Sequence, residues 1–389
     1  MIRILYRTWF EFAGWLFCLT WWLIWLQGQI CWWQPMVLWV AFMVLFLLTR
    51  QLRFNGGAIP FVAILVLIGW VFLARLNASW ATLQFWGALV ACVAYVLGLW
   101  IGTRRFLYPL MWAGAALGLL AATALFGQSA GGAQAWLTLF GVRFQPVELA
   151  RIFLVFYLAH YFTEERPRWE LLVILSAFFL ILAWQRDLGP ALLVFFVFCW
   201  MSLHWKFTWP KLFGYIVATA CGFIFAYLWF PHLRSRALAW LWPWDYLDSK
   251  GYQVLQGLFA LRSGGVVGQG LGAGFAQVIP NVHTDYLFAV IGEEFGFLGT
   301  FSLLMVYLSL AFWALRLLHA VQDKLLQMLG LGLTLLLHVQ VFLVVGGVLR
   351  LVPFTGMTLP LVSYGSTSLV AQLAMLGMLV GLGGKRGEE

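Results

Sequence analysis

A polar run from His283 to Gly296 interrupts an otherwise apolar stretch and holds three carboxylates, Asp285, Glu293 and Glu294. Acidic side chains at the boundary of a membrane helix are costly, so they are functional candidates. Asp285 lies at the polar end of the run, where a carboxylate can take a proton from a hydroxyl as a general base. Glu293 and Glu294 lie about two helical turns deeper and cannot share one helix face, so we expect one of them to hydrogen-bond to a neighbouring helix.

The two residues before Asp285 are further candidates for binding a substrate, namely His283 and Thr284. His283 is explained equally well as a residue at the entry of a helix. Cations near such a carboxylate can neutralise an anionic leaving group, so basic residues on the same side of the membrane become relevant.

A second polar segment, 144–151, contains Pro146, Glu148 and Arg151. Proline suits the first turn of a helix, and Glu148 complements the positive end of the helix dipole. Arg151 lies three residues later, on the same helix face as Glu148. The segment therefore predicts either a capped helix with a local ion pair or part of a ligand site.

A third segment, 185–191, contains Arg186 and Asp187. Asp187 directly precedes an apolar run, and we expect it to cap the helix that begins there. It can also orient a basic residue in a substrate cavity, and the two roles are compatible.

A fourth segment, 353–368, is rich in hydroxyl groups and includes Ser363, Gly365 and Ser366. A turn of this kind at the start of a helix can bind an anion or a sugar through N–H groups and side chains. It lacks the strand, turn and helix that frame the nucleophile of a serine hydrolase.

The glycine-dense stretch 264–274 follows a polar segment that contains Pro231 and Pro243. These residues predict that 231–284 lacks regular structure. The glycines do not form a dinucleotide site, because no strand precedes them and no βαβ unit follows. They indicate close approach of the backbone to a headgroup or to neighbouring helices.

Together these segments resemble the SEDS family, the RodA/FtsW/SpoVE membrane glycosyltransferases that polymerise peptidoglycan. The resemblance rests on the segments already described and on Trp242-Pro243-Trp244-Asp245 and Gly251-Tyr252-Gln253. It places the essential aspartate of the family at Asp285. The sequence departs from the family pattern at several positions, which are Val147, Arg151, Arg186, Val344, Arg350 and Ser366.

Composition defines the elements that must position these residues. The 389 residues are 63% hydrophobic and only 10% charged, whereas soluble domains carry about 25% charged residues. The chain is therefore expected to be an all-α polytopic membrane protein. No concentrated basic face indicates nucleic-acid binding.

Apolar runs that can cross ~30 Å of hydrocarbon predict about twelve transmembrane helices. They lie near 10–27, 35–49, 58–75, 80–101, 107–126, 145–162, 170–184, 188–204, 211–230, 285–315, 325–349 and 361–381. We expect one membrane domain over 1–389, with an extra N-terminal helical pair in 1–56, a ten-helix SEDS-like core in 57–389 and one long outer loop, 231–284.

The distribution of basic residues predicts that both termini are cytoplasmic, by the positive-inside rule. The predicted inner segments carry Arg3, Arg7, Arg50, Arg53, Arg104, Arg105, Arg166, Arg168, Lys206, Lys211, Arg316, Lys324, Lys385 and Arg386. Basic residues on the outer side include Arg234, Lys250 and Arg262, which we expect to bind an anionic group. The alternative is that long outer loops tolerate such residues freely.

The resemblance implies an inverting glycosyltransferase in the bacterial inner membrane, with its active site on the extracytoplasmic face. It would join lipid II units, release undecaprenyl diphosphate and work with a class B penicillin-binding protein. A divalent cation, Mg²⁺ or Mn²⁺, is a possible cofactor at an outward carboxylate that faces a diphosphate. Two alternatives stay open: a flippase or transporter of a lipid-linked precursor, and a non-catalytic scaffold of the cell-wall machinery.

Overall fold

The computed structural model describes residues 33–104, 108–130, 132–139, 141–164 and 166–384. Helices dominate these residues, which confirms the all-α prediction. The expected span 10–27 and the basic residues Arg3, Arg7, Arg105, Lys385 and Arg386 lie outside the described residues.

The remaining expected spans each coincide with a helix. These helices are α2 (Trp33–Gln51), α3 (Ile59–Leu76), α4 (Ala78–Gly102), α5 (Pro109–Phe126), α6 (Val147–Thr163), α7 (Arg168–Trp184), α8 (Leu188–Trp205), α9 (Trp209–Trp229), α12 (Leu287–His319), α13 (Lys324–Val348) and α14 (Ser366–Leu382). Among the described residues, 8 helices are long and apolar enough to cross a membrane. An integral membrane protein is thus confirmed, while the count of about twelve spans stays a prediction.

The expectation of an irregular segment over 231–284 is wrong in its first half. This region forms α10 (Pro231–Leu241) and α11 (Lys250–Gly264), with short 3-10 turns at Pro243–Tyr246 and Ala276–Val278. Pro231 occupies the first turn of α10, where a proline has no N–H bond to lose and favours helix initiation. The linker 242–249 and the glycine-rich stretch after α11 lack a long regular element.

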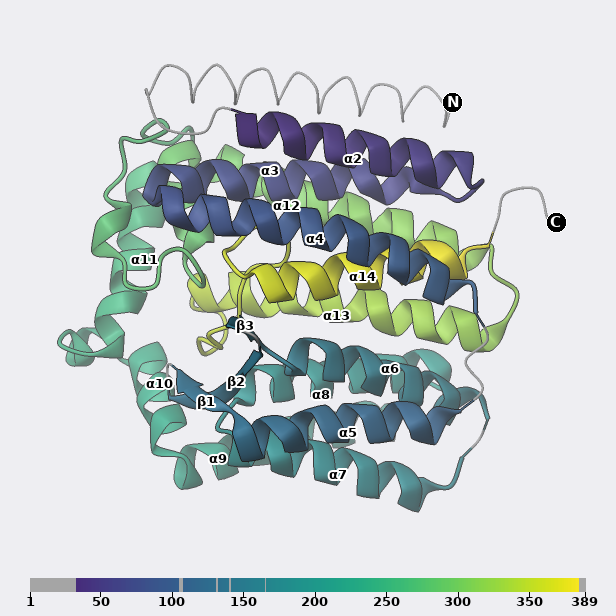
Figure 1. Ribbon diagram of the computed structural model, residues 1–389. Helices are drawn as coiled ribbons and strands as arrows, with labels where there is room; N and C mark the ends of the chain where they lie inside the picture. The colour runs from purple at the N-terminus through teal and green to yellow at the C-terminus, as the bar shows by residue number, and fades with distance from the viewer. Residues whose placement is uncertain (1–32, 105–107, 131, 140, 165, 385–389) are drawn as a thin grey trace. The chain divides into compact units, whose positions relative to one another are not determined.

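A small antiparallel sheet joins α5 to α6 in a segment that was not predicted to form strands. Its strands are β1 (Gln128–Ala130), β2 (Ala133–Leu139) and β3 (Val142–Phe144), in the order β1-β2-β3. Gln128 pairs with Trp136, and Leu137 pairs with Phe144. The sheet packs beside α5 (Figure 1) and leads directly into the Glu148 helix.

The chain divides into two compact units that are discontinuous in sequence. The first unit comprises the described parts of Met1–Arg104, Phe259–Gln322 and Thr358–Glu389. Within it α4 packs closely along α14, and α2 and α12 lie against α3 (Figure 1). The closeness depends on glycine, because a Cβ at Gly98 or Gly377 would overlap the carbonyl oxygen of Ala374 or Tyr95.

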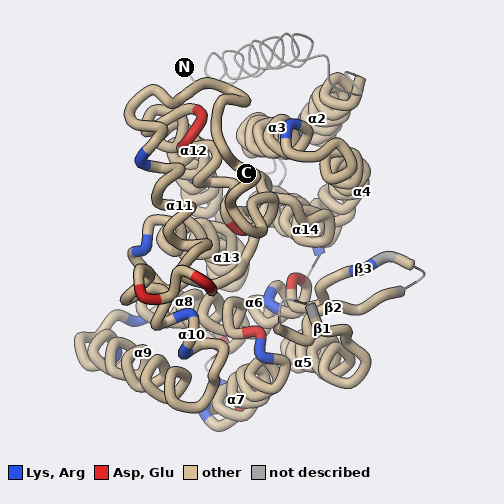
Figure 2. The backbone as a smooth tube through the Cα atoms, turned by 90° about the vertical axis from the view of Figure 1, so that its left-hand side faces the viewer, with Lys and Arg blue, Asp and Glu red and all other residues tan. Residues whose placement is uncertain are grey.

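The second unit comprises the described parts of Arg105–Leu258 and Asp323–Met357. In it α13 packs against α6 and α8, and α5 lies along α6 and α7. Helices α4, α5, α8 and α14 contain no Lys, Arg, Asp or Glu, so they are drawn in tan in Figure 2. Charged residues are scarce in these helices, so the charged side chains that are buried in other parts of the chain are candidates for a functional role.

Candidate functional site

Asp285 lies in a turn that ends directly before α12. Its backbone N–H donates to the carbonyl oxygen of Asn281 at 3.2 Å, and its side chain is half-buried. The next residue, Tyr286, is fully buried and begins a buried stretch of α12. The carboxylate therefore stands at the boundary between a polar turn and a packed helix, as the sequence predicted.

The turn before α12 is joined to the hydroxyl-rich segment that precedes α14. The N–H of Tyr364 donates to the carbonyl oxygen of His283 at 2.9 Å. The His283 ring stacks on Trp80 of α4, with centroids 4.0 Å apart. Burial lowers the pKa of His283, so the imidazole is neutral at pH 7. His283 lies in the turn before α12 and not in the helix itself, which begins at Leu287.

Gln84 of α4 fixes the backbone of the hydroxyl-rich segment. Its Nε2 donates to the carbonyl oxygen of Ser363 at 3.2 Å, and its Oε1 accepts from the N–H of Gly365 at 3.2 Å. Ser366 begins α14, and its hydroxyl donates to the carbonyl oxygen of Leu83. Gly87 provides the space for this serine, because a Cβ there would lie 2.6 Å from the Ser366 Cβ. The departure from the family pattern at Ser366 is thus accommodated locally.

Helix α12 is broken at Gly296, where φ is 64° and ψ is −162°. The glycine-rich segment 265–270 passes beside the break and replaces the lost helical hydrogen bonds. The carbonyls of Glu293 and Glu294 accept from the N–H groups of Gln269 and Gly270, at 3.0 and 2.9 Å. On the far side of the break, Phe297 and Leu298 donate to the carbonyls of Gly265 and Val266, at 2.9 and 3.1 Å. Every one of these backbone groups would otherwise lack a partner in an apolar environment.

The two glutamates also hold the glycine-rich segment through their side chains. Glu293 accepts from the N–H of Phe275 at 3.0 Å, and Glu294 accepts from the N–H of Gly272 at 3.1 Å. Glu294 forms an ion pair with Arg75 of α3, and Arg75 donates to the carbonyl of Gly274 at 3.2 Å. Both carboxylates therefore serve structure, and one of them reaches a neighbouring helix as the sequence analysis expected.

In the second unit, Glu148 and Arg151 form a buried ion pair in the first turns of α6. Gln145 donates from Nε2 to the Asp187 carboxylate at 3.3 Å. The expectation that Asp187 caps α8 is wrong, because its side chain makes no capping hydrogen bond and contacts Gln145 instead. Burial raises the pKa of Asp187 to about 6, and the nearby Glu148 adds to the increase. Pro146 occupies the N-cap position of α6.

The other predicted basic residues belong to both units: Arg186, Arg234 and Lys250 to the second and Arg262 to the first. Arg186, Arg234 and Arg262 are exposed, and Lys250 begins α11. The family that the sequence resembles has proline at the position of Arg186. Arg186 has φ of 59°, a value that proline cannot adopt, so this turn differs from the one that a proline would form. Thr284 donates from its hydroxyl to the carbonyl of Asn281 at 3.1 Å.

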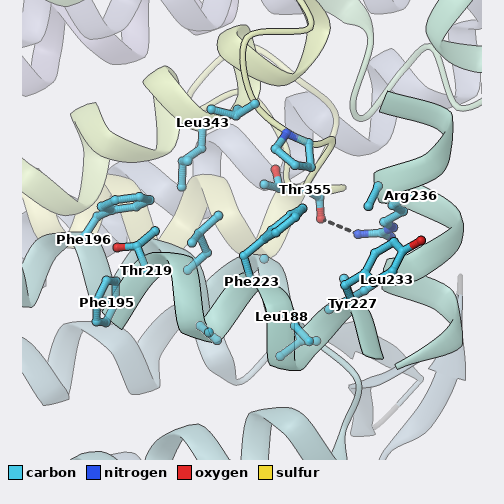
Figure 3. Close-up of a pocket in the computed structure, with 18 of the residues that line it drawn as sticks. Leu188, Phe195, Phe196, Thr219, Phe223, Tyr227, Leu233, Arg236, Leu343 and Thr355 are labelled. Atoms are coloured by element: carbon cyan, nitrogen blue, oxygen red, sulfur yellow. Dashed lines mark hydrogen bonds between the residues drawn. The ribbon is translucent and has the colours of Figure 1, made fainter. Parts of the chain in front are cut away.

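An apolar cavity of about 450 Å³ lies within the second unit, between α8, α9, α10 and the segment after α13. Phe195, Phe196 and Phe223 lie along it in Figure 3. Arg236 stands among its lining residues and donates to the carbonyl of Thr355 at 2.9 Å (Figure 3). The cavity suits an apolar chain that carries an anionic group near one end.

Arg350 connects the end of α13 to α10. Its backbone is left-handed, with φ of 59°, at a position where the family has glycine. Its guanidinium donates to the carbonyls of Trp240 and Leu241, at 2.6 and 2.8 Å, and its own carbonyl accepts from the Trp240 indole at 3.0 Å. These bonds offset the strain of the backbone.

The predicted site residues did not include Trp80, Gln84, Arg75 and Arg236, although Arg75 and Arg236 belong to the outer basic residues that suggested an anionic ligand. Gln84 carried a usable signal, since it is an amide in an otherwise apolar helix. For Arg236 the signal was its place among the outer basic residues, but Arg234 and Arg236 point to different sides of α10 and the sequence alone does not say which side faces inward.

Known proteins share this architecture. Residues 57–386 match the family model of FtsW, RodA and SpoVE, described as "Cell cycle protein". The chain is 35% identical over 271 residues to peptidoglycan glycosyltransferase RodA of Mycobacterium tuberculosis, covering 64% of this chain and 57% of that protein. It is 32% identical over 307 residues to a probable peptidoglycan glycosyltransferase FtsW of Geobacter metallireducens, covering 75% of this chain and 82% of that protein.

Solved structures agree in fold. A chain of a peptidoglycan synthase complex that coordinates polymerization and crosslinking has a TM-score of 0.71 and 29% identity, covering 87% of this chain and all of that one. The rod shape determining protein RodA of Thermus thermophilus has a TM-score of 0.64 and 27% identity over the same shares. The chain belongs to the FtsW/RodA/SpoVE family.

Proposed function

We propose that this protein polymerises peptidoglycan glycan strands from lipid II and releases undecaprenyl diphosphate. The observation that carries the proposal is Asp285, a half-buried carboxylate at the entry of α12 in a turn tied to the hydroxyl-rich segment before α14. The names of the relatives support it, since RodA and FtsW proteins are peptidoglycan glycosyltransferases.

In the proposed reaction Asp285 is the general base. The Asp285 carboxylate takes the proton of the acceptor sugar hydroxyl while that oxygen bonds to the anomeric carbon of the donor. The bond from this carbon to the diphosphate breaks, and the diphosphate leaves with its electron pair. One displacement inverts the anomeric configuration, which fits an α-linked donor and a β-linked product.

The cavity of the second unit, taken by itself, has the character of a site for a lipid chain. Its walls are apolar, as a polyprenyl chain requires, and Arg236 supplies a cation for a diphosphate. An Arg236→Ala variant should raise the KM for lipid II about tenfold. Arg53→Ala, a change at an exposed residue after α2, should leave the KM unchanged.

A resident metal ion does not fit the described residues. They contain no group of three His, Cys, Asp or Glu side chains that could hold one. Mg²⁺ or Mn²⁺ therefore enters the proposal only as an ion that the substrate diphosphate brings with it, and no step is derived through it. Polymerisation assays with and without a chelator test this point.

We also propose that the protein lies in the bacterial inner membrane with both termini cytoplasmic and the active site outside. The basic residues of alternate segments support this orientation. In a background without native cysteines, an impermeant thiol reagent added outside should label Ser249→Cys and not Phe207→Cys, since both positions are exposed. The reverse pattern would place Asp285 on the cytoplasmic side.

A class B penicillin-binding protein is the proposed partner. The relative found in a peptidoglycan synthase complex supports this assignment. Co-purification of the tagged chain with each penicillin-binding protein of its cell tests the assignment directly.

Purified protein incubated with labelled lipid II in detergent tests the proposed activity. Asp285→Asn should lower the polymerisation rate roughly 10²–10⁴-fold without changing the melting temperature. Asp245→Asn, at an exposed carboxylate outside the turn, is the matched control and should keep most of the activity. A rate for Asp285→Asn close to that of the wild type would contradict the assignment.

Transport of a lipid-linked precursor is the second candidate, because broken helices such as α12 are common in transporters. Movement of lipid II between the leaflets of liposomes without polymer formation would favour transport. Neither polymer nor movement would favour a scaffold.

A further inference from the structure

The ion pair between Arg75 and Glu294 joins three segments that are distant in the sequence. Arg75 comes from the last turn of α3, Glu294 precedes the break in α12, and both bond the glycine-rich segment between them. The Glu294 side chain is wholly buried, and that of Arg75 is 15% exposed. A charge pair that is largely buried is weak evidence for stability alone, because apolar side chains would often serve as well.

Because α12 is broken at Gly296, residues 287–295 form a short helical segment that can rotate about the break. Residues 287–295 extend about 13 Å at the usual helical rise, with Asp285 beyond one end and the break at the other. A rotation of roughly 5° about the break therefore moves Asp285 by about 1 Å. A displacement of that size at a reacting group can cost on the order of 10²-fold in rate.

Close packing at the glycines around the pair restricts such a rotation. A Cβ at Gly268 would overlap the carbonyl of Glu294, and one at Gly264 would overlap the carbonyl of Gly292. At Gly274 a Cβ would lie 2.6 Å from a carboxylate oxygen of Glu293. The glycine-rich segment is thus in close contact with the last turn of the short helical segment 287–295. Arg75 bonds both of them.

We propose that Arg75 and Glu294 are positioning residues for Asp285. They fix the angle of the short helical segment at its break and so hold the carboxylate where it meets the acceptor hydroxyl. The inference rests on the proposed role of Asp285. Their side chains bond each other and the glycine-rich segment, so in this role their removal should lower kcat and leave the KM for lipid II unchanged.

The test uses a variant that removes both charges together, since removing one would leave the other buried without a partner. Arg75→Gln with Glu294→Gln should lower kcat roughly tenfold to a hundredfold with an unchanged KM. Arg75→Lys, with Glu294 intact, keeps the charge pair and should keep most of the wild-type kcat. The matched control is Arg166→Gln with Glu170→Gln, a pair at the start of α7 that lies outside the site and should leave kcat unchanged.

A second measurement is independent of catalysis. A spin label on Thr284→Cys, next to Asp285, should become more mobile in the double variant Arg75→Gln with Glu294→Gln. In Arg75→Lys the label should keep the spectrum that it has with wild-type Arg75. Unchanged label mobility and a kcat within about twofold of the wild type would overturn the proposal.

The two readouts separate this inference from the proposed activity. If the wild type does not polymerise lipid II, the proposed function fails, and the label alone decides whether the pair fixes the turn. If the neutral variant does not fold, Arg75→Lys carries the test. A Lys variant with wild-type kcat and label mobility would then support the proposal by showing that a cation at this position is sufficient, whereas loss of kcat with unchanged mobility would contradict a positioning role.

Discussion

Two buried arginine–glutamate pairs stand in different units and are built differently. Glu148 and Arg151 lie three residues apart on α6, so they meet as soon as that helix forms. Arg75 and Glu294 lie on α3 and α12 and meet only when both helices and the glycine-rich segment have packed. The first pair is a local feature, and the second is a tertiary feature.

The difference shows how each unit holds its polar residues. The second unit places Glu148 and Arg151 beside Gln145 and Asp187 at the starts of two intact helices. The first unit breaks a helix and completes it with another part of the chain. We therefore expect the first unit to be sensitive to small backbone changes and the second to changes of charge.

The largest expected effect is that of Gly268→Ala. Gly268 has φ of 90°, and a Cβ there would overlap the carbonyl of Glu294. We expect a loss of roughly 4–5 kcal/mol or of the folded protein, measured by thermal melting in detergent. Gly265→Ala is the matched control, since Gly265 also has positive φ, 54°, but open space around its Cβ position. Gly265→Ala should cost only about 1–2 kcal/mol. Equal losses of stability in the two variants would show that the left-handed backbone, and not the overlap with the Glu294 carbonyl, sets the cost of alanine in this segment.

The next effect concerns the local pair. Glu148→Leu leaves the buried Arg151 cation without its partner and should cost roughly 3 kcal/mol. The double variant, with Arg151→Leu as well, should recover most of this stability because no buried charge remains. Denaturant unfolding in detergent measures both. A double variant no more stable than Glu148→Leu would indicate that the pair itself organises α6.

A smaller effect depends on pH and tests the neighbour of that pair. The pKa of Asp187 is raised from 3.8 to about 6 in the folded protein, so the folded state holds this proton more tightly than the unfolded state. Its contribution to stability is complete below about pH 4 and is lost as the pH rises to about 6. Asp187→Asn should remove this decline and raise the melting temperature at pH 7 relative to the wild type. An unchanged pH profile would contradict the assignment of the titration to Asp187.

The smallest effect concerns Arg350, whose guanidinium bonds offset a left-handed backbone. Arg350→Ala loses the bonds and keeps the strain, for a cost of about 2 kcal/mol. Arg350→Gly loses the bonds and relieves the strain, so its cost should be about 1 kcal/mol. Melting temperatures that rank Gly below Ala would contradict this account.

The sequence predicted the helices well because hydropathy is a local property. Every expected span on the described residues has its helix, and Asp285 lies at a helix entry as expected. The same local reasoning failed at Pro231, which was interpreted as a breaker although it begins α10. It also failed at Asp187, whose partner Gln145 belongs to another segment.

The sequence by itself therefore determined a predominantly helical membrane protein, its polar motifs and the family resemblance, and it offered the local Glu148–Arg151 pair as one of two interpretations of segment 144–151. Each of these depends on composition or on residues a few positions apart. Only the tertiary structure decided that Arg75 meets Glu294, that Gln84 and Trp80 support the Asp285 region and that the glycine-rich segment completes a broken helix. Those partners are distant along the chain, and only the packing of the helices brings them within hydrogen-bonding distance.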